Sequence, residues 1–337
     1  MAGFHIGADE NGLGSRLGPM IVTAVLAEVD ERGERTLSRK LPKRIREELD
    51  DSKRLMSHTD VALGEAWARV LTGGTATTPG ALFELLSLEG TAKLKQPCPK
   101  AAGQQCWSEA GETFSSSDDQ LKRVTSHVSA LAERGVRIVE VRSSVVCTQQ
   151  LNENRARGIN RFVSDLHAME RLILRLQGRA AAPVHAICGK VGGIGEYGKF
   201  FGPLSGWLRA TIVEGQAESA YQFPKLGRVR FLRDADAHAP LVMLASLVGK
   251  YVRELFMSRI GYHYPSDQEQ PRPSGYHDPV TAAFVRRTDL VRKERGMPDR
   301  CFERERDPLI EKEPKQAKAK KAPRRPSSRR PKGASLT

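Results

Sequence analysis

The feature that most restricts the fold of this chain is an adjacent pair of acids, Asp9 and Glu10. The pair follows a short apolar segment and precedes the glycine-rich run 12–18. Neighbouring carboxylates repel each other, so a sheltered pair is costly unless a cation neutralises it. Hard divalent ions such as Mg²⁺ prefer carboxylate oxygens, and glycines let backbone approach a large anionic ligand closely. The run therefore predicts a strand and loop that hold a metal ion beside a phosphate-bearing substrate.

The length and composition allow one large domain or two smaller ones. The chain has 337 residues, and 39% of them are hydrophobic, which is enough for a folded core. No apolar run is long enough to span a bilayer, and residues 1–5 lack the pattern of a signal peptide. The five cysteines are widely spread and odd in number, which argues against a secreted disulfide framework. We therefore expect a cytoplasmic protein without a membrane partner.

Positive charge is concentrated near the C-terminus. The net charge is +14, and residues 312–332 carry ten Lys or Arg against one acid. This segment is rich in Pro, Ala and Ser, so it cannot bury a core and should be disordered. An arm that neutralises nucleic-acid phosphates is favoured over a solubilising tail. We expect one folded domain over residues 1–305 and a disordered basic tail over residues 306–337.

Strand patterns mixed with helix patterns predict an α/β fold. We expect strands at 3–8, 19–28, 136–144, 184–188, 211–214 and 228–233. We expect helices at 38–50, 57–72 (capped by Ser57 or Thr59), 117–134, 158–178 and 239–257, with another beginning in 273–279. Residues 73–119 have the composition of an insertion with one short helix near 80–88.

Two cysteines, Cys98 and Cys106, lie within that insertion. Thiolates with seven residues between them could bind a metal, but the sequence offers no second pair that completes a zinc site. Two free thiols are therefore the expectation for this segment.

A later pair of acids, Asp234 and Asp236, follows the strand expected at 228–233. Acids at the ends of separate strands can converge, and three or four carboxylates can hold two Mg²⁺ ions about 4 Å apart for phosphodiester hydrolysis. Taken alone, Asp234 and Asp236 could equally well cap the long helix that follows. The order of the motifs along the chain changes this balance.

Five motifs follow one another in a specific order. They are Asp9-Glu10-Asn11-Gly12-Leu13-Gly14 with Gly18-Pro19, Asp51-Ser52-Lys53-Arg54-Leu55, Ala235-Asp236-Ala237, Ala245-Ser246 with Lys250, and Ser274-Gly275-Tyr276. Together they resemble the type 2 ribonuclease H family (ribonuclease HII-like), nearest its archaeal and eukaryotic branch. The likeness covers residues 3–60 and 136–292, and leaves out the insertion and the tail.

The resemblance implies a ribonuclease H-like fold, which is a central mixed β-sheet flanked by helices. It also implies an endonuclease that cuts the RNA strand of RNA/DNA hybrids, including ribonucleotides embedded in DNA, with Mg²⁺ or Mn²⁺. The expected partner is an RNA/DNA hybrid or a ribonucleotide-containing duplex DNA, and we expect the protein to be a monomer. By motif, the metal-site carboxylates would be Asp9, Glu10 and Asp236.

The same resemblance implies a set of substrate contacts. Backbone groups of Gly12-Leu13-Gly14 would lie against the ribonucleotide, whose 2′-hydroxyl distinguishes RNA from DNA. Ser52 and Lys53 would meet phosphates, and Tyr276 would stack on the sugar at the RNA–DNA junction. The structural alternatives are a solvated surface charge for Lys53 and a core aromatic for Tyr276.

Two positions depart from the family's pattern. Leu13 stands where the family usually has Arg or Lys, which should weaken phosphate binding. Gly189, in the run Ala186-Ile187-Cys188-Gly189-Lys190, stands where a buried strand normally ends in a metal-ligating Asp. It has no ligand atom, and the neighbouring thiol of Cys188 suits Mg²⁺ poorly.

Three explanations of Gly189 are open. Catalysis is weakened while substrate binding is kept, or Glu196 or Asp234 fills the vacancy, or the alignment is wrong by a few residues. We favour the first, because a lost metal-site carboxylate should harm kcat more than hybrid binding. The expected function is thus an endoribonuclease of reduced activity, and the alternative is a noncatalytic hybrid-binding protein. A weaker third possibility is a general basic DNA-binding protein whose acids only cap helices.

Overall fold

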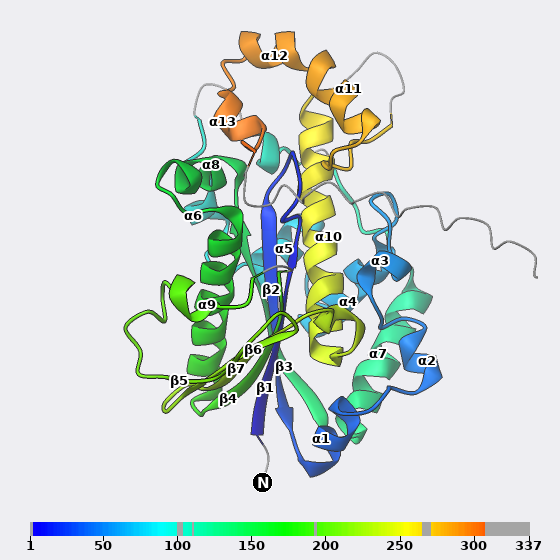
Figure 1. The fold of residues 1–337 in the computed structure, drawn as a ribbon. Helices are drawn as coiled ribbons and strands as arrows, with labels where there is room; N and C mark the ends of the chain where they lie inside the picture. The colour runs from blue at the N-terminus through cyan, green and yellow to red at the C-terminus, as the bar shows by residue number, and fades with distance from the viewer. Residues whose placement is uncertain (1–2, 100–103, 110, 192–193, 265–270, 307–337) are drawn as a thin grey trace, which may run out of the picture. The chain divides into compact units, whose positions relative to one another are not determined.

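A central sheet organises the folded part of the chain. The computed structural model describes residues 3–99, 104–109, 111–191, 194–264 and 271–306, which fall in one compact unit. Its seven-stranded sheet has the order β3-β2-β1-β4-β7-β6-β5 (Figure 1). β1 is parallel to β4 and β4 to β7, and the other neighbours are antiparallel. The strands are β1 (Gly3–Asn11), β2 (Met20–Val29), β3 (Val136–Val146), β4 (Val184–Gly189), β5 (Ala210–Glu214), β6 (Glu218–Phe223) and β7 (Gly227–Leu232).

Helices cover both faces of the sheet, so the expected α/β fold with a mixed central sheet is confirmed. In Figure 1, α9 lies on one side of the sheet, and α10, α4 and α7 lie on the other. The α-helices are α1 (Glu31–Leu37), α2 (Lys43–Arg46), α3 (Ser52–Leu55), α4 (Ala62–Leu71), α5 (Pro79–Leu86), α6 (Thr91–Lys95), α7 (Asp118–Glu133), α8 (Thr148–Ala156), α9 (Arg161–Ala180), α10 (Pro240–His263), α11 (Pro279–Arg287), α12 (Asp289–Glu294) and α13 (Asp299–Phe302). Three 3₁₀ turns are η1 (Gln105–Trp107), η2 (Gly198–Phe200) and η3 (Ala235–Ala237).

The sheet separates two apolar cores, and β1 contributes to both sides. Ile6 and Ala8 pack in the core beneath α9, where the expected apolar face of that helix is fully buried. Gly7 faces α10, and a Cβ atom at this position would lie 2.3 Å from the backbone carbon of Leu241. Because α10 rests directly on the backbone of β1, its side chains are held at a fixed height above the end of that strand.

Two helix predictions were wrong in their boundaries. The basic stretch 38–50 is not one helix, because α1 ends at Leu37 and Pro42 precedes the single turn of α2. The helix expected at 57–72 begins only at Ala62, with Val61 as its N-cap residue. Neither Ser57 nor Thr59 caps it. The Ser57 hydroxyl instead accepts hydrogen bonds from the backbone N–H groups of Thr59 and Asp60 in a local turn.

Most of the other element predictions are confirmed, and one strand and several short helices were missed. The expected short helix near 80–88 is α5, and the helix at 117–134 is α7 with a complete capping box at Ser117. The sequence patterns did not predict β6 or the helices α1, α3, α6, α8, α12 and α13. Residues 73–119 are more than a surface insertion, because Leu82, Phe83 and Leu86 of α5 are buried in the core beside α10.

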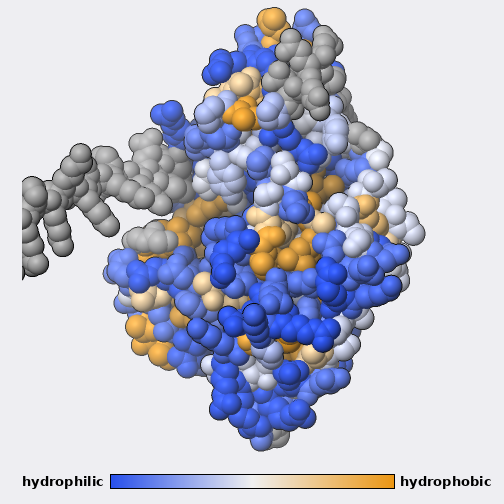
Figure 2. All heavy atoms as spheres, turned by 90° about the vertical axis from the view of Figure 1, so that its right-hand side faces the viewer, coloured by the Kyte–Doolittle hydropathy of each residue, from blue (hydrophilic) through white to orange (hydrophobic). Residues whose placement is uncertain are grey.

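The surface and the ends of the described region add two observations. On the face seen in Figure 2, hydrophilic residues cover most of the surface. In the part of the chain that is described, no helix has both the length and the apolar composition needed to cross a membrane. The tail expected over residues 306–337 lies, apart from its first residue, outside the described residues.

Candidate active site

All ten site residues predicted from the sequence line a single cavity of about 550 Å³. The parallel strands β1, β4 and β7 end at one edge of the sheet, and the cavity contains residues from or near all three ends. This is the edge at which ligands bind in open α/β sheets. The ten residues are Asp9, Glu10, Gly12, Leu13, Gly14, Ser52, Lys53, Gly189, Asp236 and Tyr276.

The acid pair lies within β1 rather than after it, because the strand extends to Asn11. Burial is the main cause that raises the pKa of Asp9 well above its usual range, and repulsion from Glu10 adds to it. Burial also raises the pKa of Glu10 to about 8, with Asp165 as the next cause. A hydrogen bond to Ser246 of α10 partly offsets the effect on Asp9. The pair is thus an electrostatically frustrated group that a divalent cation would relieve.

Asp236 brings a third carboxylate to the cavity from η3. Its Oδ2 atom accepts a hydrogen bond of 3.0 Å from the Lys53 ammonium. The Asp236 side chain is 19% exposed and that of Lys53 is 77% exposed, so the lysine covers the acid from the solvent side. Burial alone would lower the pKa of Lys53, but the contact with Asp236 outweighs it and raises the pKa.

The capping alternative for the later acids is not supported. Asp234 and Asp236 accept no helix-capping hydrogen bond, and Ala239 is the N-cap residue of α10. Asp234 adopts a left-handed conformation with φ of +56°, and its side chain is 73% exposed. It lines the rim of the cavity, 3.8 Å from the guanidinium of Arg233.

Gly189 lies directly beside the acid pair. It is the last residue of β4, one position beyond Cys188, which pairs with Ala8 of β1. A Cβ atom on Gly189 would lie 2.5 Å from Oδ1 of Asp9 and 3.7 Å from Oε2 of Glu10. The Asp9 carboxylate therefore occupies the space in which a side chain at position 189 would begin. The residue at this position faces the pair, which argues against an alignment error.

The two acids considered as substitutes for Gly189 do not lie beside the pair. Glu196 is 52% exposed and forms an ion pair with Lys199, and Asp234 points outward at the rim. The acid that does approach the pair is Asp165 of α9, which the sequence analysis missed. It is buried, and its Oδ1 atom has no hydrogen-bond partner among the described residues.

Asp165 was detectable from the sequence pattern. It lies on the apolar face of α9, between Phe162 and Met169, where an acid is unexpected. Burial raises its pKa well above the usual range, and the charge of Asp9 raises it further. A buried acid on an otherwise apolar helix face was therefore the available indication of a further group at the site.

The glycine loop is held in place by a buried arginine of α10. Gly12 has φ of +88°, and a Cβ atom there would lie 2.6 Å from Nε of Arg253. Arg253 donates hydrogen bonds of 2.9 Å to the Ser15 hydroxyl and to the Ser274 carbonyl. Its guanidinium carbon lies 4.5 Å from the ring centre of Tyr276. One side chain thus ties the loop to Tyr276, whose 42% exposure excludes the core-aromatic alternative.

A second buried arginine, Arg304, holds the loop from the other side. It donates to the carbonyl of Gly12 at 2.5 Å and to that of Gly18 at 2.7 Å. Arg161 of α9 adds a hydrogen bond of 3.2 Å to the Ser15 carbonyl. Since these carbonyls are engaged inside the protein, the loop has a fixed shape, and Gly14 is exposed at its tip.

Lysines supply the positive charge that Leu13 does not. Lys250 reaches the carbonyls of Ser52 at 2.9 Å and of Met56 at 2.5 Å, and so fixes the Ser52 loop at the cavity. Lys190, next to Gly189, also lines the cavity and was missed by the sequence analysis. Burial lowers the pKa of Lys190 to about 8, and its ammonium donates to the Ser219 hydroxyl at 2.6 Å.

The donor set fits a hard divalent ion in its chemistry. Asp9, Glu10 and Asp236 line the cavity together with Asp234 and Glu254, and Asp165 approaches from α9. Among the described residues, however, no three His, Cys, Asp or Glu side chains are already arranged to hold an ion. Binding would therefore require side chains such as that of Asp9 to rotate.

Comparison with known proteins gives similarities among solved structures only. No protein-family model matches the chain, and no curated protein matches it. A mutant of Bst-RNase HIII is 17% identical over 89% of this chain and 65% of that chain, with a TM-score of 0.45. RNase HII of Archaeoglobus fulgidus, solved in a complex with PCNA, is 14% identical over 92% of this chain and 98% of that chain, with a TM-score of 0.40.

A third similar structure is the ribonuclease H2 of Pyrococcus horikoshii OT3, which is 14% identical over 89% of this chain and 92% of that chain, with a TM-score of 0.35. The chain spans just under two thirds of the length of the Bst protein. All three are ribonucleases of the kind that the motif order resembles. At this level of identity, the function has to be argued from the residues of the cavity.

Proposed function

We propose that this protein is a metal-dependent endonuclease that cuts the RNA strand of RNA/DNA hybrids, including ribonucleotides embedded in DNA. The observation that carries the proposal is the convergence of five separated sequence motifs on one cavity, which contains the buried Asp9 and the half-buried Glu10. Helix capping does not require such convergence. A cavity of about 550 Å³ that is lined by both acids and lysines suits a phosphodiester together with a divalent ion.

In this proposal each group has a distinct task. Asp9, Glu10 and Asp236 would hold Mg²⁺ or Mn²⁺, which supplies charge stabilisation at the phosphate and an activated water. Lys53 binds a phosphate oxygen after leaving Asp236, which is then free to act as a ligand. The exposed tip of the glycine loop presents backbone to the ribonucleotide, where the 2′-hydroxyl is recognised. Tyr276 offers its exposed ring to the sugar beyond the cut.

Gly189 supports a second candidate function, which is hybrid binding without cleavage. The position beside the acid pair carries no oxygen ligand, while the loop, the lysines and Tyr276 remain available for the duplex. Since metal-bound charge acts mainly on the transition state, a missing ligand lowers kcat more than affinity. Of these two candidates we favour the endonuclease, with reduced turnover.

The experiment is a cleavage assay on a DNA duplex with one ribonucleotide, in Mg²⁺ and in Mn²⁺. Slow cleavage by the unchanged protein and a gain of at least about tenfold in Gly189→Asp are expected. The atoms nearest an added Cβ belong to the carboxylates of Asp9 and Glu10 and not to the backbone, so the fold should tolerate the new side chain once Asp9 rotates. Gly178→Asp is the matched control, because this exposed glycine of α9 has no atom within 4 Å of an added Cβ.

The outcomes separate the candidates. Tight hybrid binding with no cleavage in either variant at high Mn²⁺ supports the noncatalytic protein. Full activity in the unchanged protein, with no gain in Gly189→Asp, refutes the missing-ligand explanation. Equal binding to hybrid and to plain DNA, falling steeply with salt, contradicts both and leaves a general DNA-binding protein.

The basic segment 312–332 would act as an electrostatic arm for the same substrate. Its ten Lys or Arg against one acid favour contact with phosphates in any sequence. Removal of residues 308–337 should weaken binding to hybrid and to DNA alike and make the dependence of affinity on salt less steep. An unchanged salt dependence would contradict this role.

A further inference from the structure

Four of the five cysteines line a second cavity, of about 400 Å³, that is distinct from the acid cavity. Cys98 and Cys106 come from the segment 73–119, Cys147 lies between β3 and α8, and Cys301 lies in α13. Cys98 and Cys106 are free thiols, as expected for the segment 73–119. The sequence did not reveal that a second pair, Cys147 and Cys301, lines the same cavity.

The four thiols are close enough to influence one another in every pairing. Burial is the main cause that raises the pKa of Cys106, and Cys301, Cys147 and Cys98 raise it further. Burial raises the pKa of Cys301 to about 12, with Cys147 and Cys98 as the next causes. Burial is also the main cause that raises the pKa of Cys147, and the neighbouring thiol of Cys98 adds to it. The four sulfur atoms therefore belong to one group of thiols at a single cavity.

Local contacts already orient two of the sulfur atoms. The Cys147 sulfur accepts a hydrogen bond of 3.4 Å from the backbone N–H of Gln150 at the start of α8. The indole of Trp107 is hydrogen-bonded to Cys98. Hydrogen bonds from N–H groups to sulfur stabilise a metal-bound thiolate, as do the positive ends of helices. Both sulfurs are thus placed for ligation.

The charge of the cavity wall also suits a metal thiolate centre. Four thiolates around one divalent ion have a net charge of −2. The wall carries three cationic side chains, Lys93, Arg157 and Arg171, against two acids, Glu89 and Glu153. Opposite charge nearby stabilises a buried anionic centre. The surplus of positive charge has the sign that such a centre requires.

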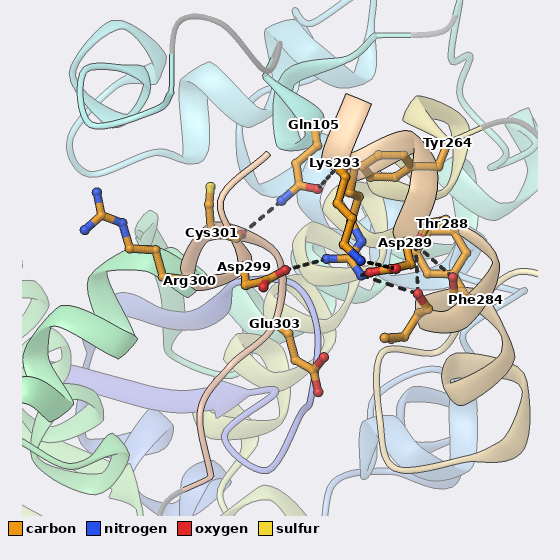
Figure 3. A network of polar contacts seen from close by, with 12 residues as sticks. Gln105, Tyr264, Phe284, Thr288, Asp289, Lys293, Asp299, Arg300, Cys301 and Glu303 are labelled. Carbon is orange, nitrogen blue, oxygen red and sulfur yellow. Dashed lines mark hydrogen bonds and ion pairs between the residues drawn. The ribbon is translucent and has the colours of Figure 1, made fainter. Parts of the chain in front are cut away.

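The segments that carry the thiols are joined by hydrogen bonds. Figure 3 shows Gln105, next to Cys106, reaching across to the carbonyl of Cys301 at 3.0 Å, and the Tyr264 hydroxyl donating to Gln105. Asn152 of α8 donates hydrogen bonds of 2.9 Å to the carbonyls of Arg300 and Glu303 on either side of Cys301. The backbones of three of the four positions are therefore already held together.

We propose that Cys98, Cys106, Cys147 and Cys301 form a structural Zn²⁺ site that fastens the segment 73–119 and α13 to the start of α8. Binding replaces four S–H protons by four Zn–S bonds and releases four protons to solvent. Zn²⁺ with four cysteine ligands is the closed tetrahedral arrangement of structural zinc sites. Among the described residues no three His, Cys, Asp or Glu side chains are already arranged to hold an ion, so binding requires these thiols to move.

A Zn²⁺ ion bound at these cysteines would affect the acid cavity indirectly, without taking part in its chemistry. α13 leads directly to Arg304, which holds the carbonyls of Gly12 and Gly18 in the glycine loop. A metal at Cys301 would therefore limit the motion of the segment that supports the loop. The inference itself does not depend on the proposed nuclease function, since metal content is measured independently of cleavage.

The experiment measures metal in the full-length protein, purified without chelator, supplied with Zn²⁺ and dialysed. One Zn²⁺ per chain is expected in the unchanged protein and in Cys188→Ala, which removes the one cysteine outside the cluster. Cys106→Ser and Cys301→Ser should bind Zn²⁺ at least about tenfold more weakly. Co²⁺ added to the metal-free, unchanged protein should give tetrahedral ligand-field bands and a thiolate-to-metal charge-transfer band, both abolished by Zn²⁺.

The cobalt spectrum keeps the inference testable even where a serine variant fails to fold. An octahedral Co²⁺ spectrum without the charge-transfer band overturns it. So does a Zn²⁺ content that is the same in Cys106→Ser and in the unchanged protein. A mass lower by four hydrogens under non-reducing conditions would assign the thiols to disulfides instead, and the visible absorption of an iron–sulfur cluster would assign them to iron.

Discussion

The acid cavity and the cysteine cavity each bring several ionisable side chains together, but they do so in opposite ways. The acids arrive in pairs or short motifs at the ends of adjacent parallel strands, where the sheet itself brings them together. The thiols come from three separate segments of the chain, joined through side-chain contacts such as that of Gln105 with Cys301. Sheet topology thus brings the acids together at one edge of the sheet. The thiols share no sheet or helix that would hold them together. A bound metal ion would supply that connection.

The largest expected effect is on cleavage, and it distinguishes a substitution in the acid cavity from one in the cysteine cavity. Asp236→Asn should lower cleavage of the ribonucleotide duplex by about 100-fold or more and leave the melting temperature nearly unchanged. Cys106→Ser should lower the melting temperature while turnover at low temperature is largely kept. Single-turnover cleavage and thermal unfolding on the same samples measure both. Asp234→Asn is the control, and an equal loss from it would break the assignment of Asp236.

Arg304 links the two regions, so its removal should disturb both. Arg304→Met leaves the carbonyls of Gly12 and Gly18 without their buried donor and should cost about 3 kcal/mol of unfolding free energy. Denaturant unfolding measures this loss, and a raised KM with a smaller change in kcat would report the loosened loop. The exposed Arg300→Gln should change neither, and a stable Arg304→Met would show that the loop holds itself.

Glu170 of α9 tests how far burial alone raises the pKa of a carboxyl group in this protein. Burial raises its pKa to about 7, against hydrogen bonds from the backbone N–H groups of Leu204 and Gly202. A raised folded-state pKa means that its stabilising contribution is complete below pH 4.5, its unfolded value, and is lost as pH rises through 7. That contribution is at most about 3 kcal/mol.

The measurement is unfolding free energy against pH for the unchanged protein and for Glu170→Gln. The glutamine keeps an acceptor for Leu204 but cannot ionise, so the decline between pH 4.5 and 7 should become shallower. Glu196→Gln, at an exposed acid, serves as control. Parallel curves for Glu170→Gln and the unchanged protein would contradict a burial-driven shift.

The smallest effect concerns Asp165. Asp165→Asn removes a buried carboxyl with an unpartnered oxygen and a repulsive neighbour of Asp9, so the metal-free protein should gain about 1 kcal/mol. Cleavage should fall at the same time if this acid serves the metal site. Thermal unfolding without divalent ions and a cleavage assay with Mn²⁺ measure the two effects. A loss of stability would show that Asp165 is an integral part of the core.

The acid cavity could be largely predicted from the sequence, and the reasons are local. Asp9-Glu10 and the glycines after them form a contiguous signal, and the parallel strand ends bring Gly189 beside them. The helix expected at 38–50 was wrong because one proline, Pro42, outweighs basic composition. The cysteine cavity could not be predicted, since single cysteines at 147 and 301 carry no spacing pattern until the fold places them together.

The contact of Arg304 with the glycine loop also has a consequence for the order in which the protein matures during synthesis. The acid pair and the loop leave the ribosome before Arg304, which is made almost 300 residues later. Chains fold from the N-terminal end as they emerge, so β1 and β2 can pair early. The loop takes its final shape only after Arg304 has been released, so a nascent or truncated product that lacks Arg304 carries the acids without an assembled site.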